Sequence, residues 1–137
     1  MPHDPVKLEE ARSWFKKAHD DLRAASVDME ARPPLLEDAL FHYQQAVEKA
    51  MKGFLAWHDE PFRKTHSLTE LGLVCTRLDP SLEATLRKAA SLTEYATVYR
   101  YPGDSVPPTE EDAAGVRELA EEVLSELLAR LPGEITA

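Results

Sequence analysis

The stretch PPLLEDALFHYQQAVEKAMKGFLAW, residues 33–57, decides the fold. After its two prolines, apolar residues recur at steps of three and four, which keeps them on one face of an α-helix. These residues are Leu36, Leu40, Tyr43, Val47, Ala50, Phe54 and Trp57. Glu48 and Lys52 are four residues apart and are expected to pair on the polar side of this helix. The stretch therefore predicts one long amphipathic helix that ends near Trp57.

The residues before the two prolines show the same spacing. Asp4-Pro5 is typical of a helix start, because aspartate accepts from free backbone amides and proline fits the first helical position. The apolar stripe that follows is Leu8, Ala11, Phe15, Ala18, Leu22, Ala25 and Met29. Pro33 disfavours the α conformation in the residue before it, so this helix should end there. Two long helices with so short a link are expected to form an antiparallel hairpin.

Three more helices are predicted in the rest of the chain. Ser67 and Glu70 have the spacing of a capping box and open a short helix. Its inward residues are expected to be Leu68, Leu71, Cys75 and Leu78. Asp79-Pro80 starts a fourth helix, which should run past Tyr99 to the break at Pro102-Gly103. Its inward stripe is expected to be Leu82, Leu86, Ala89, Thr93 and Ala96.

The last predicted helix begins after Thr109, which resembles another cap. Its apolar stripe is Val116, Ala120, Val123 and Leu127, and Leu119, Leu124, Leu128 and Leu131 widen that face. A helix that is apolar beyond one stripe usually has a second surface to cover, as does the neighbourhood of Trp14. These side chains predict a homodimer.

No segment alternates as a strand does, so the sequence predicts an all-α protein. The expected architecture is an up-and-down four-helix bundle, with four long helices and one additional short one. A chain of 137 residues suits a single domain. We assign residues 1–137 to one domain, with a core over about residues 6–131.

The charge of the chain is unevenly distributed. The net charge is −9, and residues 104–137 hold nine acidic and two basic residues. A negative surface repels phosphate backbones at long range, so nucleic-acid contact would need a local basic patch in the first three quarters. No apolar run approaches the roughly 20 residues of a membrane span, and residues 1–10 lack the apolar core of a signal peptide. We therefore expect a cytoplasmic protein without a membrane span.

Metal and redox chemistry have little support in the sequence pattern. The single Cys75 excludes an internal disulfide and is expected in the core. The five histidines are His3, His19, His42, His58 and His66, and none lies three or four residues from another. No pair of imidazoles is thus placed on one helix face, as HxxxH metal sites require. We predict no metal site and no cofactor.

Two regions could carry a ligand site. One is the polar side of the second helix, with Gln44, Gln45, Glu48, Lys49 and Lys52, for which a solvated face is the alternative. The other joins the start of the third helix to the end of the fourth. A helix start offers amides to an anion, and guanidinium, imidazole, lysine and aromatic groups suit a phosphate and a base. The predicted ligand-binding residues are Arg100, His66, Tyr101, Tyr99, Lys49, Gln45 and Arg63.

The end of the fourth helix, TVYRYPGD at residues 97–104, is expected to straddle two environments. Successive helical residues turn by about 100°, so Tyr99, Arg100 and Tyr101 cannot all face the core. We expect Tyr99 to be mostly buried, and Arg100 and Tyr101 to point to the edge of the cleft near His66. The alternative is a structural role, in which Arg100 pairs with Glu94, Glu70 or Asp104.

These residues together resemble the HEPN domains of bacteria and archaea. The resemblance spans roughly residues 6–131 and rests on three groups of residues. They are Trp14, Ala18 and Asp21-Leu22; the run FHYQQAVEKA at residues 41–50; and Thr65-His66-Ser67-Leu68 and Leu71 followed by Tyr95 and Arg100-Tyr101-Pro102. The order of the helix-two run, THSL and RYP makes the resemblance fairly specific.

The resemblance implies a bundle of four to five helices that commonly forms homodimers. HEPN proteins are often encoded beside a minimal nucleotidyltransferase, with which they form a toxin–antitoxin-like pair. Several members are metal-independent ribonucleases with an Arg-x(4–6)-His motif near the start of a late helix. No histidine follows Arg100 here, and Arg12 with His19 matches that spacing only in the first helix. The related Arg-x4-His-x-Tyr signature, whose tyrosine can be nucleotidylated, is also missing.

The sequence therefore favours an HEPN-like protein without the usual ribonuclease motif. It would bind a nucleotide or another phosphate ligand and act with a nucleotidyltransferase partner. One alternative is a metal-independent ribonuclease with a composite site of His66 and Arg100. Another is a purely structural interaction module. The sequence assigns no catalytic residue.

Overall fold

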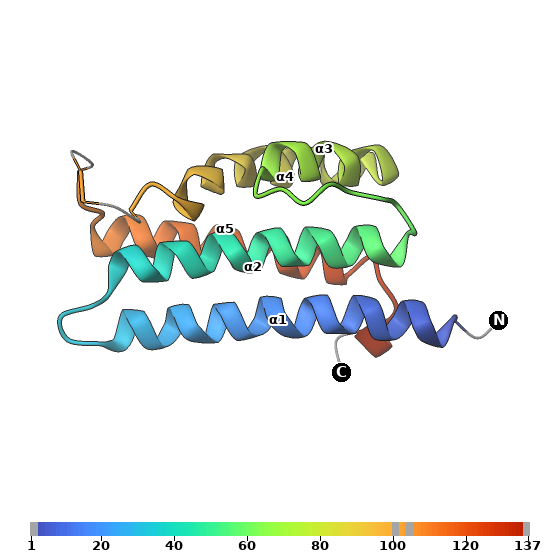
Figure 1. Ribbon diagram of the computed structural model, residues 1–137, viewed down its shortest axis with the longest axis horizontal. Helices are drawn as coiled ribbons and strands as arrows, with labels where there is room; N and C mark the ends of the chain where they lie inside the picture. Colours follow the sequence, from blue (N-terminus) through green and yellow to red (C-terminus); the bar gives the residue numbers. More distant parts are fainter. Residues whose placement is uncertain (1–2, 100–101, 104–105, 136–137) are drawn as a thin grey trace.

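The computed structural model describes residues 3–99, 102–103 and 106–135. These residues form five α-helices and no strand, which confirms the all-α class (Figure 1). The helices are α1 (Pro5–Glu30), α2 (Leu36–Trp57), α3 (Leu68–Leu78), α4 (Glu83–Ala89) and α5 (Glu110–Leu128). The predicted hairpin of α1 and α2 is present, with the two helices antiparallel. No helix in the described part of the chain is both long and apolar enough to span a bilayer.

Helix α2 lies at the centre of the molecule. It packs against α1 on one side, against α5, and against α3 and the 3-10 helix η2 (Ala90–Ala96) on the side away from α1 (Figure 1). Every residue from Ala50 to Ala56 is buried. The alternative of a solvated face is wrong for Gln44, Glu48 and Lys52, which are buried too. The cause is the chain around the start of α3, which covers the side of α2 that α1 leaves open.

Helices α1 and α2 approach each other closely at Gly53. A Cβ atom at this position would lie 2.8 Å from the Phe15 ring and 2.9 Å from the Cβ atom of Trp14. Phe15 is only 1% exposed, so its ring has no free space to move into. Glycine is therefore required for the two helices to pack at this distance.

The fourth predicted helix is wrong beyond Ala89. The chain forms a 3-10 turn, η1 (Pro80–Leu82), then α4, and continues as η2 instead of an α-helix to Tyr101. A 3-10 helix has about 3.0 residues per turn, so the inward positions shift. Leu92, outside the predicted stripe, is buried. The bundle thus has three long helices, and α3 with the broken α4–η2 segment completes it.

Most predicted helix starts are confirmed by their caps. The side chain of Asp4 accepts from Val6, and Thr109 and Asp112 form a reciprocal capping box. The box predicted at the start of α3 is half wrong. Ser67 accepts from the amide of Glu70, but the Glu70 carboxylate binds Arg63 instead of returning to Ser67. The Ser67 amide donates to the hydroxyl of Thr65 at 3.0 Å.

The predicted core is largely confirmed, although several residues of the predicted stripes are only partly buried. Leu22 is only partly buried, and Leu78 is 38% exposed although it was expected to face inward. Thr93 was also expected to face inward, but it is partly buried and accepts a hydrogen bond from the Leu68 amide at 3.0 Å. Cys75 is buried as predicted, and burial raises the pKa of its thiol to about 12.

The side chains that suggested a homodimer are buried or partly buried within the chain itself. Leu124 is buried, and the other three leucines of that face pack against the core: Leu119, Leu128 and Leu131. Trp14 is partly buried and makes an edge contact with Phe62. The homodimer therefore stays a prediction, and it now rests on the HEPN resemblance alone.

Candidate functional site

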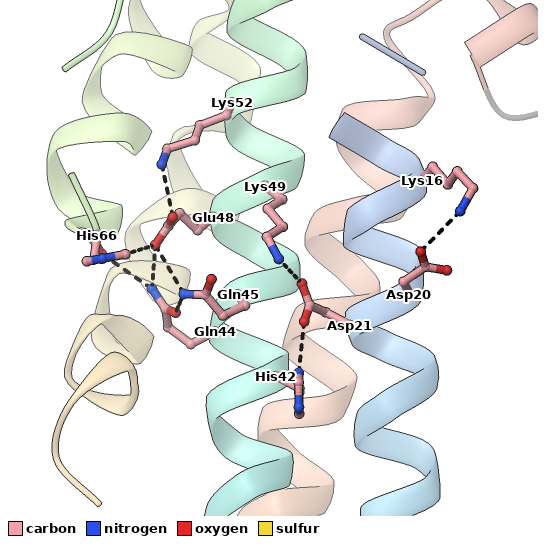
Figure 2. Close-up of polar contacts among 10 residues, drawn as sticks. All are labelled: Lys16, Asp20, Asp21, His42, Gln44, Gln45, Glu48, Lys49, Lys52 and His66. Carbon is pink, nitrogen blue, oxygen red and sulfur yellow. Dashed lines mark hydrogen bonds and ion pairs between the residues drawn. The ribbon is translucent and has the colours of Figure 1, made fainter. Parts of the chain in front are cut away.

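Two polar clusters lie on different sides of α2 (Figure 2). The first, which we call the Glu48 cluster, faces the start of α3. It consists of Glu48, Gln44, Gln45, Lys52 and His66. The second, which we call the Asp21 cluster, lies between α2 and α1. It consists of Asp21, His42 and Lys49.

Glu48 is the centre of the first cluster. Its Oε1 atom lies 2.8 Å from Nδ1 of His66, and its Oε2 atom accepts from Lys52 Nζ at 3.0 Å. The side chain is only 4% exposed. Burial raises the pKa of this carboxyl group, but hydrogen bonds from His66, Lys52 and Gln44 outweigh it and leave the pKa below the ordinary value. Glu48 is therefore a buried carboxylate anion.

The two glutamines fix the position of this carboxylate. Gln44 donates to Glu48 Oε1 at 3.2 Å and to the backbone oxygen of His66 at 3.3 Å. Gln45 donates to the side-chain oxygen of Gln44 at 2.7 Å and to Glu48 at 3.4 Å. The segment before α3 is thereby held against α2. This network explains why polar residues stand on a buried face, since each satisfies another.

Lys52 supplies the buried positive charge of the cluster. Its side chain is 11% exposed, and Nζ lies 5.7 Å from the centroid of the Trp14 ring. The carboxylate of Glu48 and the face of the indole both stabilise this ammonium group. The charges of Lys52 and Glu48 therefore cancel, and the net charge of the cluster depends on His66.

His66 brings this buried network to the surface. Its side chain is 68% exposed, in contrast to Glu48 beneath it. An ionised carboxylate only accepts hydrogen bonds, so Nδ1 of His66 carries a proton and donates it to Glu48. Nε2 is then an acceptor in the neutral ring and a donor in the charged ring. This arrangement suits either proton transfer or, with the ring protonated, the binding of an anion.

Two other predicted ligand-binding residues do not join this cluster. Lys49 points toward α1 and donates to Asp21 Oδ2 at 2.6 Å (Figure 2). Arg63 is exposed and forms two hydrogen bonds with the Glu70 carboxylate, at 2.7 and 3.0 Å. The expected grouping of Lys49 and Arg63 around His66 is therefore not seen, because a nearby carboxylate binds each of them.

The aromatic end of the predicted site lies beside acidic residues. Tyr99 stacks on Tyr95, with ring centroids 6.0 Å apart, and the two rings line a cavity of about 270 Å³ with Glu37, Asp38 and Phe41. Tyr99 is half-buried and not mostly buried as predicted, because the helix that should have turned it inward ends earlier. Arg100 and Tyr101 lie outside the described residues.

Sequence reasoning missed the Asp21 cluster. His42 lies 2.8 Å from Asp21 Oδ1 through Nδ1 and 3.4 Å from Asp38 through Nε2. Two signals were available. Asp21 and Asp28 continue the three-four spacing of the inward face of α1, and Asp38 and His42 are four residues apart on α2. Acidic residues at inward positions indicate a buried partner, which here comes from the neighbouring helix.

Comparison with known proteins identifies the family. Residues 11–131 match the family model described as HEPN domain, nearly the whole chain. This match confirms the resemblance seen in the sequence. Comparisons with curated proteins and with solved structures gave no match.

Proposed function

The chain belongs to the HEPN domain family, and from this premise we propose that it binds a nucleotide or another phosphate ligand at the Glu48 cluster. In this proposal it acts in the cytoplasm with a minimal nucleotidyltransferase, as one half of a toxin–antitoxin-like pair. The observation that carries the proposal is the contact between exposed His66 and buried Glu48. The carboxylate accepts from Nδ1 and orients the imidazole, so a protonated ring would present its Nε2–H group to an anion at the surface.

The neighbouring charges make His66 the group that decides anion binding in this cluster. Lys52 is balanced by Glu48, and Lys49 and Arg63 are balanced by Asp21 and Glu70. A phosphate would therefore gain most from the Nε2 atom of His66. Gln45 is half-buried and donates to the same carboxylate oxygen as His66, so it holds Glu48 in position for the imidazole.

The nucleotidyltransferase partner and the homodimer follow from the family resemblance. We expect the protein to co-purify with a minimal nucleotidyltransferase from the same genome when the two are co-expressed. We also expect a dimer in light scattering. A monomer at micromolar concentration would contradict the dimer and leave the ligand proposal standing, because every described member of the Glu48 cluster comes from one chain.

A second candidate function is a metal-independent ribonuclease. It is favoured by the same pair, because an imidazole oriented by a buried carboxylate is the arrangement of a general base. His66 would then take the proton of the ribose 2′-hydroxyl group. Its Nε2 atom is the reacting atom in that step, since Nδ1 is held by Glu48.

One experiment separates these functions. Purified protein is titrated with fluorescently labelled adenine nucleotides and with single-stranded RNA, in buffer containing EDTA. Binding of nucleotide without cleavage of RNA supports the ligand proposal, and cleavage supports the ribonuclease. If the protein neither binds nucleotide nor cleaves RNA, both functions are overturned and the structural interaction module is left.

Variants of two residues in the Glu48 cluster test whether the nucleotide binds there. His66→Gln should weaken nucleotide binding by about 10- to 150-fold, the equivalent of one charge-assisted hydrogen bond of about 1.5–3 kcal/mol. Glu48→Gln should also weaken it, because the imidazole loses its anionic partner. His19→Gln is the matched control, because His19 is an exposed histidine on α1 that contacts the backbone oxygen of Phe15. Equal loss in the control would refute this site.

A further inference from the structure

Three potential metal ligands meet where α1 ends and α2 begins. They are Asp28 from α1 and Asp38 and His42 from α2. One ligand atom from each side chain lies within 4.8 Å of the other two. The sequence analysis predicted no metal site, because the members of this group come from two helices and include a single histidine. It is separate from the Glu48 cluster, and its function does not depend on the ligand proposed there.

Asp28 is the member least suited to a cluster without a cation. Asp28 is only 8% exposed. Its Oδ2 atom is buried and has no hydrogen-bond partner among the described residues. An unpaired buried acceptor costs about 1–3 kcal/mol, and more when it is charged. A cation between the Asp28 and Asp38 carboxylates would pair this acceptor and remove the penalty.

His42 is held in the way that metal-binding histidines are held. Nδ1 lies 2.8 Å from Asp21 Oδ1, so it donates to that carboxylate, and Lys49 fixes Asp21 from the other side at 2.6 Å. A carboxylate on one ring nitrogen sets the tautomer and turns the other nitrogen toward the metal. Here the other nitrogen, Nε2, faces Asp38 Oδ2 at 3.4 Å.

We propose that Asp28, Asp38 and His42 bind a zinc ion, with Asp21 positioning the imidazole. Two ligand atoms about 2.0–2.1 Å from a tetrahedral zinc ion are roughly 3.4 Å apart. The distance between His42 Nε2 and Asp38 Oδ2 is 3.4 Å. Imidazole also favours zinc over the oxygen-binding ions Mg²⁺ and Ca²⁺. Three protein ligands leave a fourth position for water or a ligand atom.

The cavity beside Asp38 offers space for a small molecule next to this fourth coordination position. Its volume is about 270 Å³, and its walls include Asp38, the stacked rings of Tyr95 and Tyr99, and Phe41. A small molecule in this cavity could stack on an aromatic ring and place an acceptor atom near the metal. The proposed zinc site is thus buried on the Asp28 side and open on the Asp38 side.

The test is a zinc titration of the full chain after treatment with EDTA and removal of the chelator. We expect calorimetry to show one Zn²⁺ ion bound per chain at micromolar concentration, and thermal unfolding to shift upward with zinc. Asp28→Asn, which keeps the shape of the side chain, should weaken zinc binding at least about tenfold. Cobalt in place of zinc should give a visible absorption spectrum that this variant loses.

Matched controls distinguish this site from adventitious binding. Asp20→Asn removes an exposed carboxylate beside Asp21, and His19→Gln removes an exposed imidazole. Both should bind zinc as the wild type does, while His42→Gln should not. Asp21→Asn should weaken binding by about 10- to 100-fold through the orientation of His42. The proposal would be overturned if the wild type bound no zinc, or if folded Asp28→Asn bound zinc as well as the wild type does. If His42→Gln fails to fold, the result with Asp28→Asn still tests the proposal.

Discussion

Lys49 of α2 donates to Asp21 of α1 at 2.6 Å and ties together two helices whose paired residues are 28 positions apart. The two side chains are 25% and 10% exposed. One residue earlier on α1, Asp20 pairs with Lys16 at 3.2 Å, but those side chains are 61% and 78% exposed (Figure 2). The same helix thus carries a half-buried ion pair between helices and an exposed one within a helix.

The two pairs should differ in coupling energy. A double-mutant cycle with Asp21→Asn and Lys49→Met should give about 1.5–3 kcal/mol, because this pair is largely shielded from water. The cycle with Asp20→Asn and Lys16→Met should give about 0.3–0.5 kcal/mol. Urea unfolding of each set of variants measures both values. Equal coupling energies would mean that burial of Asp21 adds nothing to its interaction with Lys49.

Two glycines should respond to alanine with opposite signs. Gly53→Ala should destabilise the protein by about 1–3 kcal/mol, because its new methyl group meets the buried Phe15 ring. Gly115 lies inside α5, and a Cβ atom there has nothing within 4 Å. Gly115→Ala should therefore stabilise by about 0.5–1 kcal/mol through helix propensity. Thermal unfolding decides, and stabilisation by Gly53→Ala would refute the close packing of α1 and α2.

The helices could be predicted from the sequence wherever an apolar stripe and a capping residue determine where they begin and end. The boundaries of α1 and α2 follow from Asp4-Pro5 and from Pro33-Pro34. The break after α4 could not be predicted, because the residues beyond Ala89 keep an apolar spacing that an α-helix also satisfies. There the chain turns more tightly, and Thr93 accepts from the first amide of α3. A long-range hydrogen bond of this kind leaves no local pattern.

The candidate site was harder to predict than the fold for a related reason. Spacing shows which residues share a helix face, but not what covers that face. Gln45 and His66 were predicted to lie at one site, and the structure brings them together on Glu48. Lys49 was assigned to the same site, but its partner is Asp21 on the preceding helix. The partner of a charged residue can come from another helix, so the ion pairs could not be predicted from the spacing within one helix.

Burial, more than side-chain size, should rank truncations in the core. Val47 is fully buried, whereas Leu22 is only partly buried. We expect Val47→Ala to cost about 2–3 kcal/mol and Leu22→Ala less than about 2 kcal/mol, because Leu22 leaves a smaller enclosed cavity. Ser67→Ala should cost about 1 kcal/mol through the lost cap. Chemical denaturation that ranked Ser67→Ala first would contradict this order.

The ionisation of Glu48 should make stability depend on pH in the acidic range. The pKa of Glu48 lies below its ordinary value of 4.5 in the folded protein, because hydrogen bonds from His66, Lys52 and Gln44 outweigh the burial that raises it. A carboxyl group with a lowered folded pKa binds fewer protons when folded than when unfolded. Its stabilisation is therefore present above the ordinary pKa and is lost as pH falls through the folded pKa.

Glu48→Gln should remove this contribution. We expect the variant to be less stable than the wild type by about 1.5–3 kcal/mol at neutral pH. That difference should stay constant down to the ordinary pKa of glutamate and shrink as pH falls through the lower folded pKa. Urea unfolding at each pH measures it, with Glu70→Gln as control, because Arg63 lowers the pKa of Glu70 at a position more exposed than that of Glu48. The control should show a smaller difference. A Glu48 difference that grew as pH fell would mean that burial destabilises the carboxylate more than its partners stabilise it.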